Sequence, residues 1–269
     1  MHLKPFLKWA GGKRWLLERG EISVPKTGGR YIEPFLGGAA AFFHLRPQRA
    51  LLSDANASLI ETYQTIASNW VDVWTILQRH HECHSDEHYY TERRRIYSDA
   101  ASRAAQFIYL NRTCWNGLYR VNLRGEFNVP IGTKSSVIYD DDNFEMISNR
   151  LSEAVILCCD FSKTIDMAKE GDFLFIDPPY TTAHNFNGFV KYNQNIFNWN
   201  DQIRLRDCVA AAVQKGANVL LTNADHPSIY KLYESFSTIT RVERPSVISG
   251  KNRGRGTVTE AIIRAGHHG

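Results

Sequence analysis

The chain has 269 residues, of which 43% are hydrophobic, and 32 Lys and Arg against 28 Asp and Glu give a formal net charge of +4. This composition is typical of a globular protein and excludes an intrinsically disordered chain. No apolar run approaches the roughly 18 residues of a membrane-spanning helix, and the first residues lack the long apolar segment of a signal peptide. The weak positive charge permits a polyanionic partner but does not require one.

The cysteines indicate a reducing compartment. Their number, five, is odd, and none of them forms a C-x-x-C pair. Reduced thiols in a cytoplasmic protein are therefore expected rather than a disulfide framework.

Apolar runs and turn signals predict an α/β domain with an insertion. In chain order, strands are expected at 30–33, 50–53, 155–159, 173–176 and 217–222, a helix at 39–45, and a closing antiparallel pair at 236–242 and 258–264. Helices at 69–81, 86–97 and 100–110 and a loop-rich tract at 111–142 interrupt this order. Since a crossover needs about a dozen residues, a gap of about ninety is an insertion. We expect a Rossmann-like, doubly wound catalytic domain at 1–57 and 151–269, with a mainly helical domain at 58–150.

The tetrapeptide Asp177-Pro178-Pro179-Tyr180 directly follows the apolar run 172–176. The two prolines lack N–H groups and end the strand, so the acidic and aromatic side chains come at its carboxyl end. Ligands bind at that edge of an open α/β sheet. A carboxylate, free carbonyls and a flat ring suit an exocyclic amino group and its base.

A second group of residues favours a nucleoside cofactor. Gly37 and Gly38 follow a predicted strand, and Asp54 ends the next strand, where it can accept hydrogen bonds from ribose hydroxyls. The G-x-G-x-x-G fingerprint is absent, and the stretch 10–13 lacks P-loop spacing. S-adenosyl-L-methionine, which has a ribose but no phosphate, suits this pattern.

The histidine spacing and the clusters of basic residues each allow two interpretations. His80, His84 and His88 lie four residues apart, with Cys83 between them. One continuous helix would place them on one side, and an exposed helix face is favoured over a metal site. Basic residues gather at 93–95, 112–124 and 251–255, either as a nucleic-acid surface or as an unevenly charged solvated one.

Five blocks together resemble the Dam-type (D12 class) DNA adenine N6-methyltransferases. They are residues 6–13, 33–38, 53–54, 110–130 and 177–180, and they occur in the family's order over nearly the whole chain. The block 110–130 lies in the insertion and resembles the family's DNA-reading region.

The resemblance implies a cofactor site for S-adenosyl-L-methionine. Its residues are Trp9, Lys13, Phe35, Gly37, Gly38, Asp54, Asp160, Phe161 and Asp177. Trp9 could instead be an aromatic residue of the core. Asp160 would accept a hydrogen bond from the amino group of the cofactor's adenine, or could instead be the N-cap of the following helix.

The resemblance also implies the reaction. Asp177 and the Pro178 carbonyl would accept the hydrogens of the adenine amino group, while Tyr180, after Pro179, would stack on a base flipped out of duplex DNA. No metal ion is required, and a monomer is expected. The alternatives are a cytosine N4 methyltransferase and, in another class, a non-catalytic DNA-binding protein.

The implied DNA-binding residues lie mostly in the insertion. They are Lys8, Arg112, Asn116, Tyr119, Arg120, Asn122, Arg124 and Pro130. Arg124 is favoured as a base reader, while Arg112 and Arg120 have phosphate contact as their alternative. The resemblance implies GATC as the target, with longer GAT-containing sites left open. A housekeeping, phage or restriction-modification role is equally open.

Overall fold

The computed structural model describes residues 3–20, 22, 28–122, 124–183, 197–245 and 257–266. Its chain forms two compact units. The first comprises Met1–Ile22, Leu36–Gln48 and Asp54–Cys158, and the second Ser23–Phe35, Arg49–Ser53 and Cys159–Gly269. The insertion predicted at 58–150 falls within the first unit, which extends beyond it on both sides. The exact domain boundaries stay a prediction.

The second unit is built on a mostly parallel sheet. Its strands are β1 (Tyr31–Glu33), β2 (Ala50–Asp54), β4 (Phe173–Ile176), β5 (Asn218–Ala224), β6 (Thr238–Pro245) and β7 (Thr257–Ala265). With β3 (Ala154–Cys158), the order is β3-β2-β1-β4-β5-β7-β6. β4 is parallel to β1 and β5, while β7 is antiparallel to both β5 and β6. The predicted strands and the closing antiparallel pair are confirmed.

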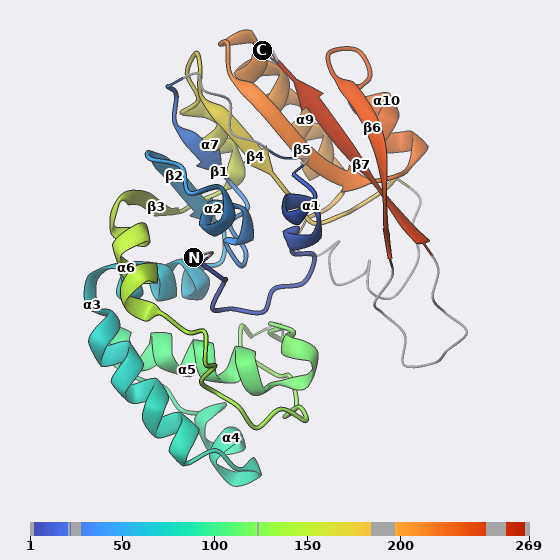
Figure 1. Ribbon diagram of the computed structural model, residues 1–269. Helices are drawn as coiled ribbons and strands as arrows, with labels where there is room; N and C mark the ends of the chain where they lie inside the picture. Colours follow the sequence, from blue (N-terminus) through green and yellow to red (C-terminus); the bar gives the residue numbers. More distant parts are fainter. Residues whose placement is uncertain are drawn as a thin grey trace. The chain divides into compact units, whose positions relative to one another are not determined.

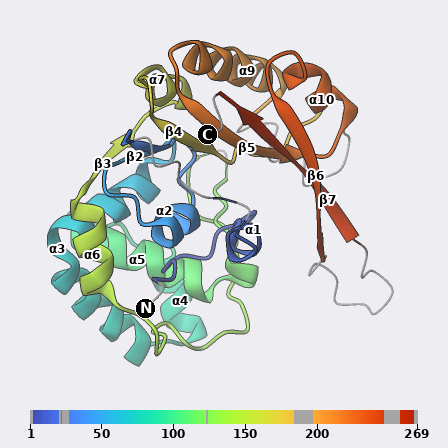
Figure 2. The ribbon, with the colours of Figure 1, turned by 45° about the horizontal axis from the view of Figure 1, so that its top comes forward.

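Burial explains the sequence of the central strands. All residues of β4 and the first six of β5 are buried, as expected for parallel strands that are covered on both faces. In the second unit, α7 (Phe161–Asp166), α9 (Trp199–Gln214) and α10 (Pro227–Tyr233) lie on one side of the sheet (Figure 2). The α/β fold class predicted from the sequence is therefore confirmed.

The first unit is mainly helical. It contains α1 (Arg14–Glu18), α2 (Ala40–Leu45), α3 (Ala57–Glu82), α4 (Asp86–Glu92), α5 (Ala100–Thr113), the short 3-10 helix η1 (Trp115–Gly117) and α6 (Phe144–Ser152). Both α5 and α6 pack against the long α3 (Figure 1). The helix predicted to start at Asn69 is part of the longer α3, and Asn69 has non-helical angles inside it. The predicted helix at 86–97 ends earlier, at Glu92.

The expectation that the three histidines lie on one exposed helix face is wrong. The helix α3 ends at Glu82, and Ser85 caps the start of α4 by accepting a hydrogen bond from the His88 N–H at 3.1 Å. His80 and His88 therefore belong to different helices, and His80 is buried. Periodicity alone missed the break because the link between the helices is short.

Among the described residues, no helix has the length and apolar character needed to cross a membrane.

Candidate active site

The tetrapeptide Asp177–Tyr180 comes directly after β4, at the carboxyl end of the parallel strands. Ile176 is paired with Leu221 of β5, so the next residues of the two strands, Asp177 and Thr222, are neighbours. The buried Thr222 hydroxyl donates to Asp177 Oδ1 at 2.7 Å. This bond fixes the orientation of the carboxylate before any substrate binds.

A second hydrogen bond holds the aromatic ring of the tetrapeptide. The Tyr180 hydroxyl donates to Oε2 of Glu260 at 2.8 Å, and Glu260 is a buried residue of β7. Burial, with the negative charges of Asp177 and Glu260, raises the pKa of Tyr180 well above its usual value. Tyr180 is therefore a neutral donor with a partly exposed, fixed ring.

Asp160 and Phe161 begin α7. Asp160 accepts from the Ser162 N–H at 2.9 Å, so the N-cap interpretation is confirmed. Arg204 of α9 donates to both Asp160 oxygens, at 2.7 and 3.0 Å. Burial favours the protonated acid, but the hydrogen bonds from Arg204 and Ser162 outweigh it and lower the Asp160 pKa below its usual value.

The ring of Phe161 is enclosed. It is only 5% exposed, it stacks on Phe35 with centroids 5.2 Å apart, and the Arg204 guanidinium carbon lies 4.3 Å from its centroid. The structure thus brings the predicted residues Phe35, Asp160 and Phe161 together. Arg204, which sequence reasoning missed, contacts both Asp160 and Phe161, two of the residues that the resemblance implies for the cofactor.

In the first unit, the glycine turn and Asp54 form one hydrogen-bonded group. Gly37, with a positive φ of 46°, donates its N–H to Asp54 Oδ2 at 3.1 Å, and the Asn56 N–H donates to Oδ1 at 2.9 Å. The Tyr63 hydroxyl donates to the Gly37 carbonyl at 2.9 Å. Burial raises the pKa of Asp54 even though these backbone bonds oppose the shift. The turn and the acid are therefore fixed to each other, as a preformed site requires.

Trp9 packs directly on this turn. A Cβ at Gly37 would lie 2.7 Å from Trp9 Cδ1, so only glycine fits there. Trp9 is partly exposed and stacks on Tyr119 with centroids 5.8 Å apart. The Lys13 side chain is buried, and its ammonium donates to the Gly11 carbonyl at 2.6 Å. Trp9 combines an aromatic packing contact with an accessible surface beside Gly37.

The prediction that Arg112 contacts DNA is wrong. Its side chain is fully buried and donates to both oxygens of Asp142, at 2.6 and 2.7 Å. It also donates to the carbonyls of Phe6, at 3.0 Å, and Val137, at 2.7 Å. Arg112 fastens chain segments within the first unit and is not available to a phosphate.

Lys8 is held by the same stretch of α5. Buried Asn111 accepts from the Lys8 N–H and donates to the Lys8 carbonyl, both at 2.8 Å. The Lys8 ammonium donates to the Arg112 carbonyl at 2.7 Å. Part of the sequence block that resembled a DNA-reading region thus positions residues 6–8.

The remaining predicted DNA-binding residues are at least partly exposed. Asn116, Arg120, Arg124 and Pro130 are exposed, whereas Tyr119 and Asn122 are half-buried. Residues 121 and 127 form an antiparallel bridge, and the Asn122 N–H donates to the Glu126 carbonyl at 2.9 Å. Arg124 therefore lies at the tip of a small hairpin. The basic cluster at 251–255 lies outside the described residues.

Sequence reasoning also missed Thr222, Glu260 and Tyr63. A weak signal existed for two of them, because Thr222 ends the apolar run of β5 and Glu260 is an acidic residue inside the apolar run of β7. Tyr63 gave no signal, since a buried tyrosine in a helix is ordinary.

The chain is similar in sequence to one known protein family and to several known methyltransferases. A sequence model of the D12 class N6 adenine-specific DNA methyltransferases matches residues 9–247. A type II methyltransferase of Lactococcus lactis subsp. cremoris is 37% identical, over 98% of this chain and 95% of that protein. A type II methyltransferase of Methanocaldococcus jannaschii is 36% identical, over 88% of this chain and 90% of that protein. A DNA adenine methylase of Haemophilus influenzae is 31% identical, over 96% of this chain and 92% of that protein.

The match covers most of the chain, including Asp177–Tyr180, and it favours adenine over the cytosine N4 alternative. This chain belongs to the D12 class of N6 adenine-specific DNA methyltransferases.

Proposed function

We propose that this enzyme moves a methyl group from S-adenosyl-L-methionine to N6 of an adenine flipped out of duplex DNA, within GATC, and that it acts as a monomer. The observation that carries the chemical part is the Asp177–Tyr180 turn after β4. There a carboxylate fixed by Thr222 and a ring fixed by Glu260 follow the same strand.

The Asp177 carboxylate makes the amino nitrogen reactive. An adenine amino group is a poor nucleophile because its lone pair is delocalised into the ring. When Asp177 and the Pro178 carbonyl accept its two hydrogens, the nitrogen pyramidalises and its lone pair turns toward the methyl donor. When bound, S-adenosyl-L-methionine supplies an electrophilic methyl group. Thr222 keeps Asp177 in the orientation that this step needs.

Tyr180 holds the flipped base. Extruding a base costs a few kcal/mol, and stacking on an aromatic ring offsets part of that cost. The hydrogen bond to Glu260 limits rotation of the tyrosine ring, so less conformational entropy is lost when the base stacks on it.

The residues proposed for the cofactor fit its parts. Asp54 is already fixed by two backbone N–H groups, and each carboxylate oxygen has a second lone pair for a ribose hydroxyl. Trp9, Lys13 and the Gly37-Gly38 backbone would hold the methionine end. Asp160 would accept a hydrogen bond from the amino group of the cofactor's adenine. Arg204 already donates to the same carboxylate.

We propose Arg124 as the base reader. Its exposed position at the hairpin tip leaves the guanidinium open to a guanine edge. Arg120 is exposed too, but it donates from Nε to Asn128 Oδ1 at 2.9 Å, which favours a fixed contact with a phosphate.

Sequencing plasmid DNA methylated by the purified protein tests the proposal, with nucleoside analysis to distinguish N6-methyladenine from N4-methylcytosine. Modified adenine confined to GATC is expected. Arg124→Ala should relax one position of the site, whereas Arg120→Ala, on the same hairpin, should weaken binding equally on all sequences. Asp177→Ala should bind DNA and transfer almost no methyl. Near-normal turnover by that variant would contradict the assigned role.

A further inference from the structure

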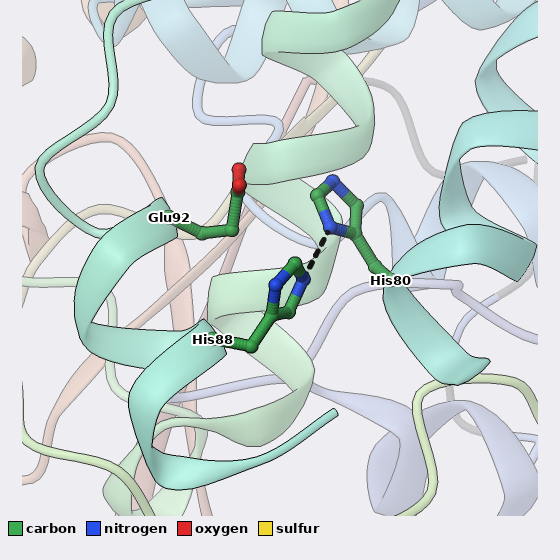
Figure 3. A group of neighbouring side chains, drawn as sticks. All are labelled: His80, His88 and Glu92. Carbon is green, nitrogen blue, oxygen red and sulfur yellow. Dashed lines mark hydrogen bonds between the residues drawn. The ribbon is translucent and has the colours of Figure 1, made fainter. Parts of the chain in front are cut away.

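Three potential metal ligands converge in the first unit, far along the chain from the tetrapeptide. They are His80 near the end of α3 and His88 and Glu92 on α4 (Figure 3). One ligand atom from each lies within 4.8 Å of those of the other two. His80 Nδ1 and His88 Nε2 are 3.0 Å apart. Neither the fold nor the methyl-transfer chemistry accounts for this cluster.

Rigid elements hold the three groups in place. His88 and Glu92 are four residues apart on α4, so they share one helix face. The ring of Tyr109, from α5, stacks on the His80 imidazole with centroids 4.8 Å apart and an interplanar angle of 17°. Three helices thus fix the donors, as a metal site requires.

Burial makes this cluster costly without a ligand. His80 is 4% exposed and Glu92 is 1% exposed. Buried polar and charged groups are costly unless they are hydrogen-bonded, paired with an opposite charge or bound to a metal ion.

We propose that His80, His88 and Glu92 bind one Zn²⁺ ion. Zinc–nitrogen bonds of about 2.0–2.1 Å in a tetrahedral arrangement place two nitrogens about 3.3–3.4 Å apart. The observed 3.0 Å between the two imidazole nitrogens is close to that spacing. A small separation of the rings would replace their hydrogen bond by two metal bonds.

The surroundings complete the site. The carboxylate of Glu92 accepts from Arg95 Nη1 at 3.0 Å and from the Tyr97 hydroxyl at 2.7 Å, and such outer partners orient a ligating carboxylate. Cys83 lines the same cavity, of about 320 Å³, and with water it is a candidate for the fourth position. The ion would link the end of α3 to α4, a structural role separate from methyl transfer.

Metal binding by the full chain tests this site. The protein, with His267 and His268 replaced by Ala to remove an adjacent histidine pair, is treated with a chelator and titrated with Zn²⁺ against a chromophoric competitor. One ion per chain is expected, with an upward shift of the melting temperature. Co²⁺ in the same protein should show the intense visible bands of four-coordinate cobalt.

Two matched variants decide the assignment. Losing an outer-shell partner weakens metal affinity by about 10–100-fold, so His88→Ala, which removes a ligand, should weaken it at least as much. His81→Ala removes an exposed histidine next to His80 and should leave affinity and cobalt spectrum unchanged. Absence of stoichiometric binding in the parent protein, or equal affinity in His88→Ala, would overturn the proposal and leave a hydrogen-bonded histidine pair.

Discussion

Replacing Arg112 by Ala should destabilise the protein rather than directly remove a DNA contact. Arg112 is 0% exposed, and it binds both oxygens of Asp142 and two backbone carbonyls. Removing one partner of a buried ion pair costs about 3–5 kcal/mol, because the other charge stays buried and unpaired. A whole domain is stabilised by only about 5–15 kcal/mol, so about a fifth or more of that margin would be lost.

Urea unfolding followed by far-ultraviolet circular dichroism measures this loss. The double variant Arg112→Met with Asp142→Leu removes both charges, so it should recover most of the stability. Arg124→Ala serves as the matched control, since exposed substitutions usually change the free energy of unfolding by no more than about 0.5 kcal/mol. If Arg112→Ala unfolded like the parent protein but lost DNA affinity, the assignment of Arg112 as a buried anchor would be refuted.

Three further substitutions test the site and the sheet. Thr222→Val keeps the side-chain shape but loses the hydrogen bond to Asp177, worth about 1.5–3 kcal/mol, so single-turnover methyl transfer should fall by about 10–100-fold while DNA binding is kept. Tyr180→Phe retains the ring but leaves buried Glu260 without this donor, so urea unfolding should show a loss of about 1–3 kcal/mol; an unchanged midpoint would contradict the role of this bond. Asp172 is buried, and although burial opposes the shift, its arginine partner and backbone N–H groups lower its pKa. Its stabilising contribution should be present above about pH 4 and lost as the pH falls through the lower pKa of the folded state. Asp172→Asn should therefore flatten the acid side of the stability–pH curve, and an unchanged curve would count against the assignment.

Much of the fold was predictable because its signals are local. Central strands such as β4 are continuous apolar runs, and the prolines after Asp177 mark where that strand ends. Segment order alone then indicated an α/β sheet with an insertion. The end of α4 at Glu92 was not predictable, because the polar residues after it are as compatible with a helix as with a turn.

The residues that orient the candidate site come from distant parts of the chain. Thr222 reaches Asp177 because β5 lies beside β4, and Glu260 reaches Tyr180 from β7. Strand order is not encoded in any short motif, so these partners could be recognised only once the sheet was known. Arg204 is a similar case, since only the position of α9 relative to α7 brings it to Asp160.

The same reasoning explains why a charged residue inside a functional motif was misassigned. Arg112 belongs to the block that resembles a DNA-reading region, and an arginine there suggests a phosphate contact. Whether it faces solvent depends on Asp142, thirty residues later, which supplies the charge that makes its burial tolerable. His80 is comparable, because its neighbours His88 and Glu92 lie on another helix. A motif identifies which residue types are present, whereas the partners that the fold brings to each side chain decide which of them remain available to DNA, cofactor or metal.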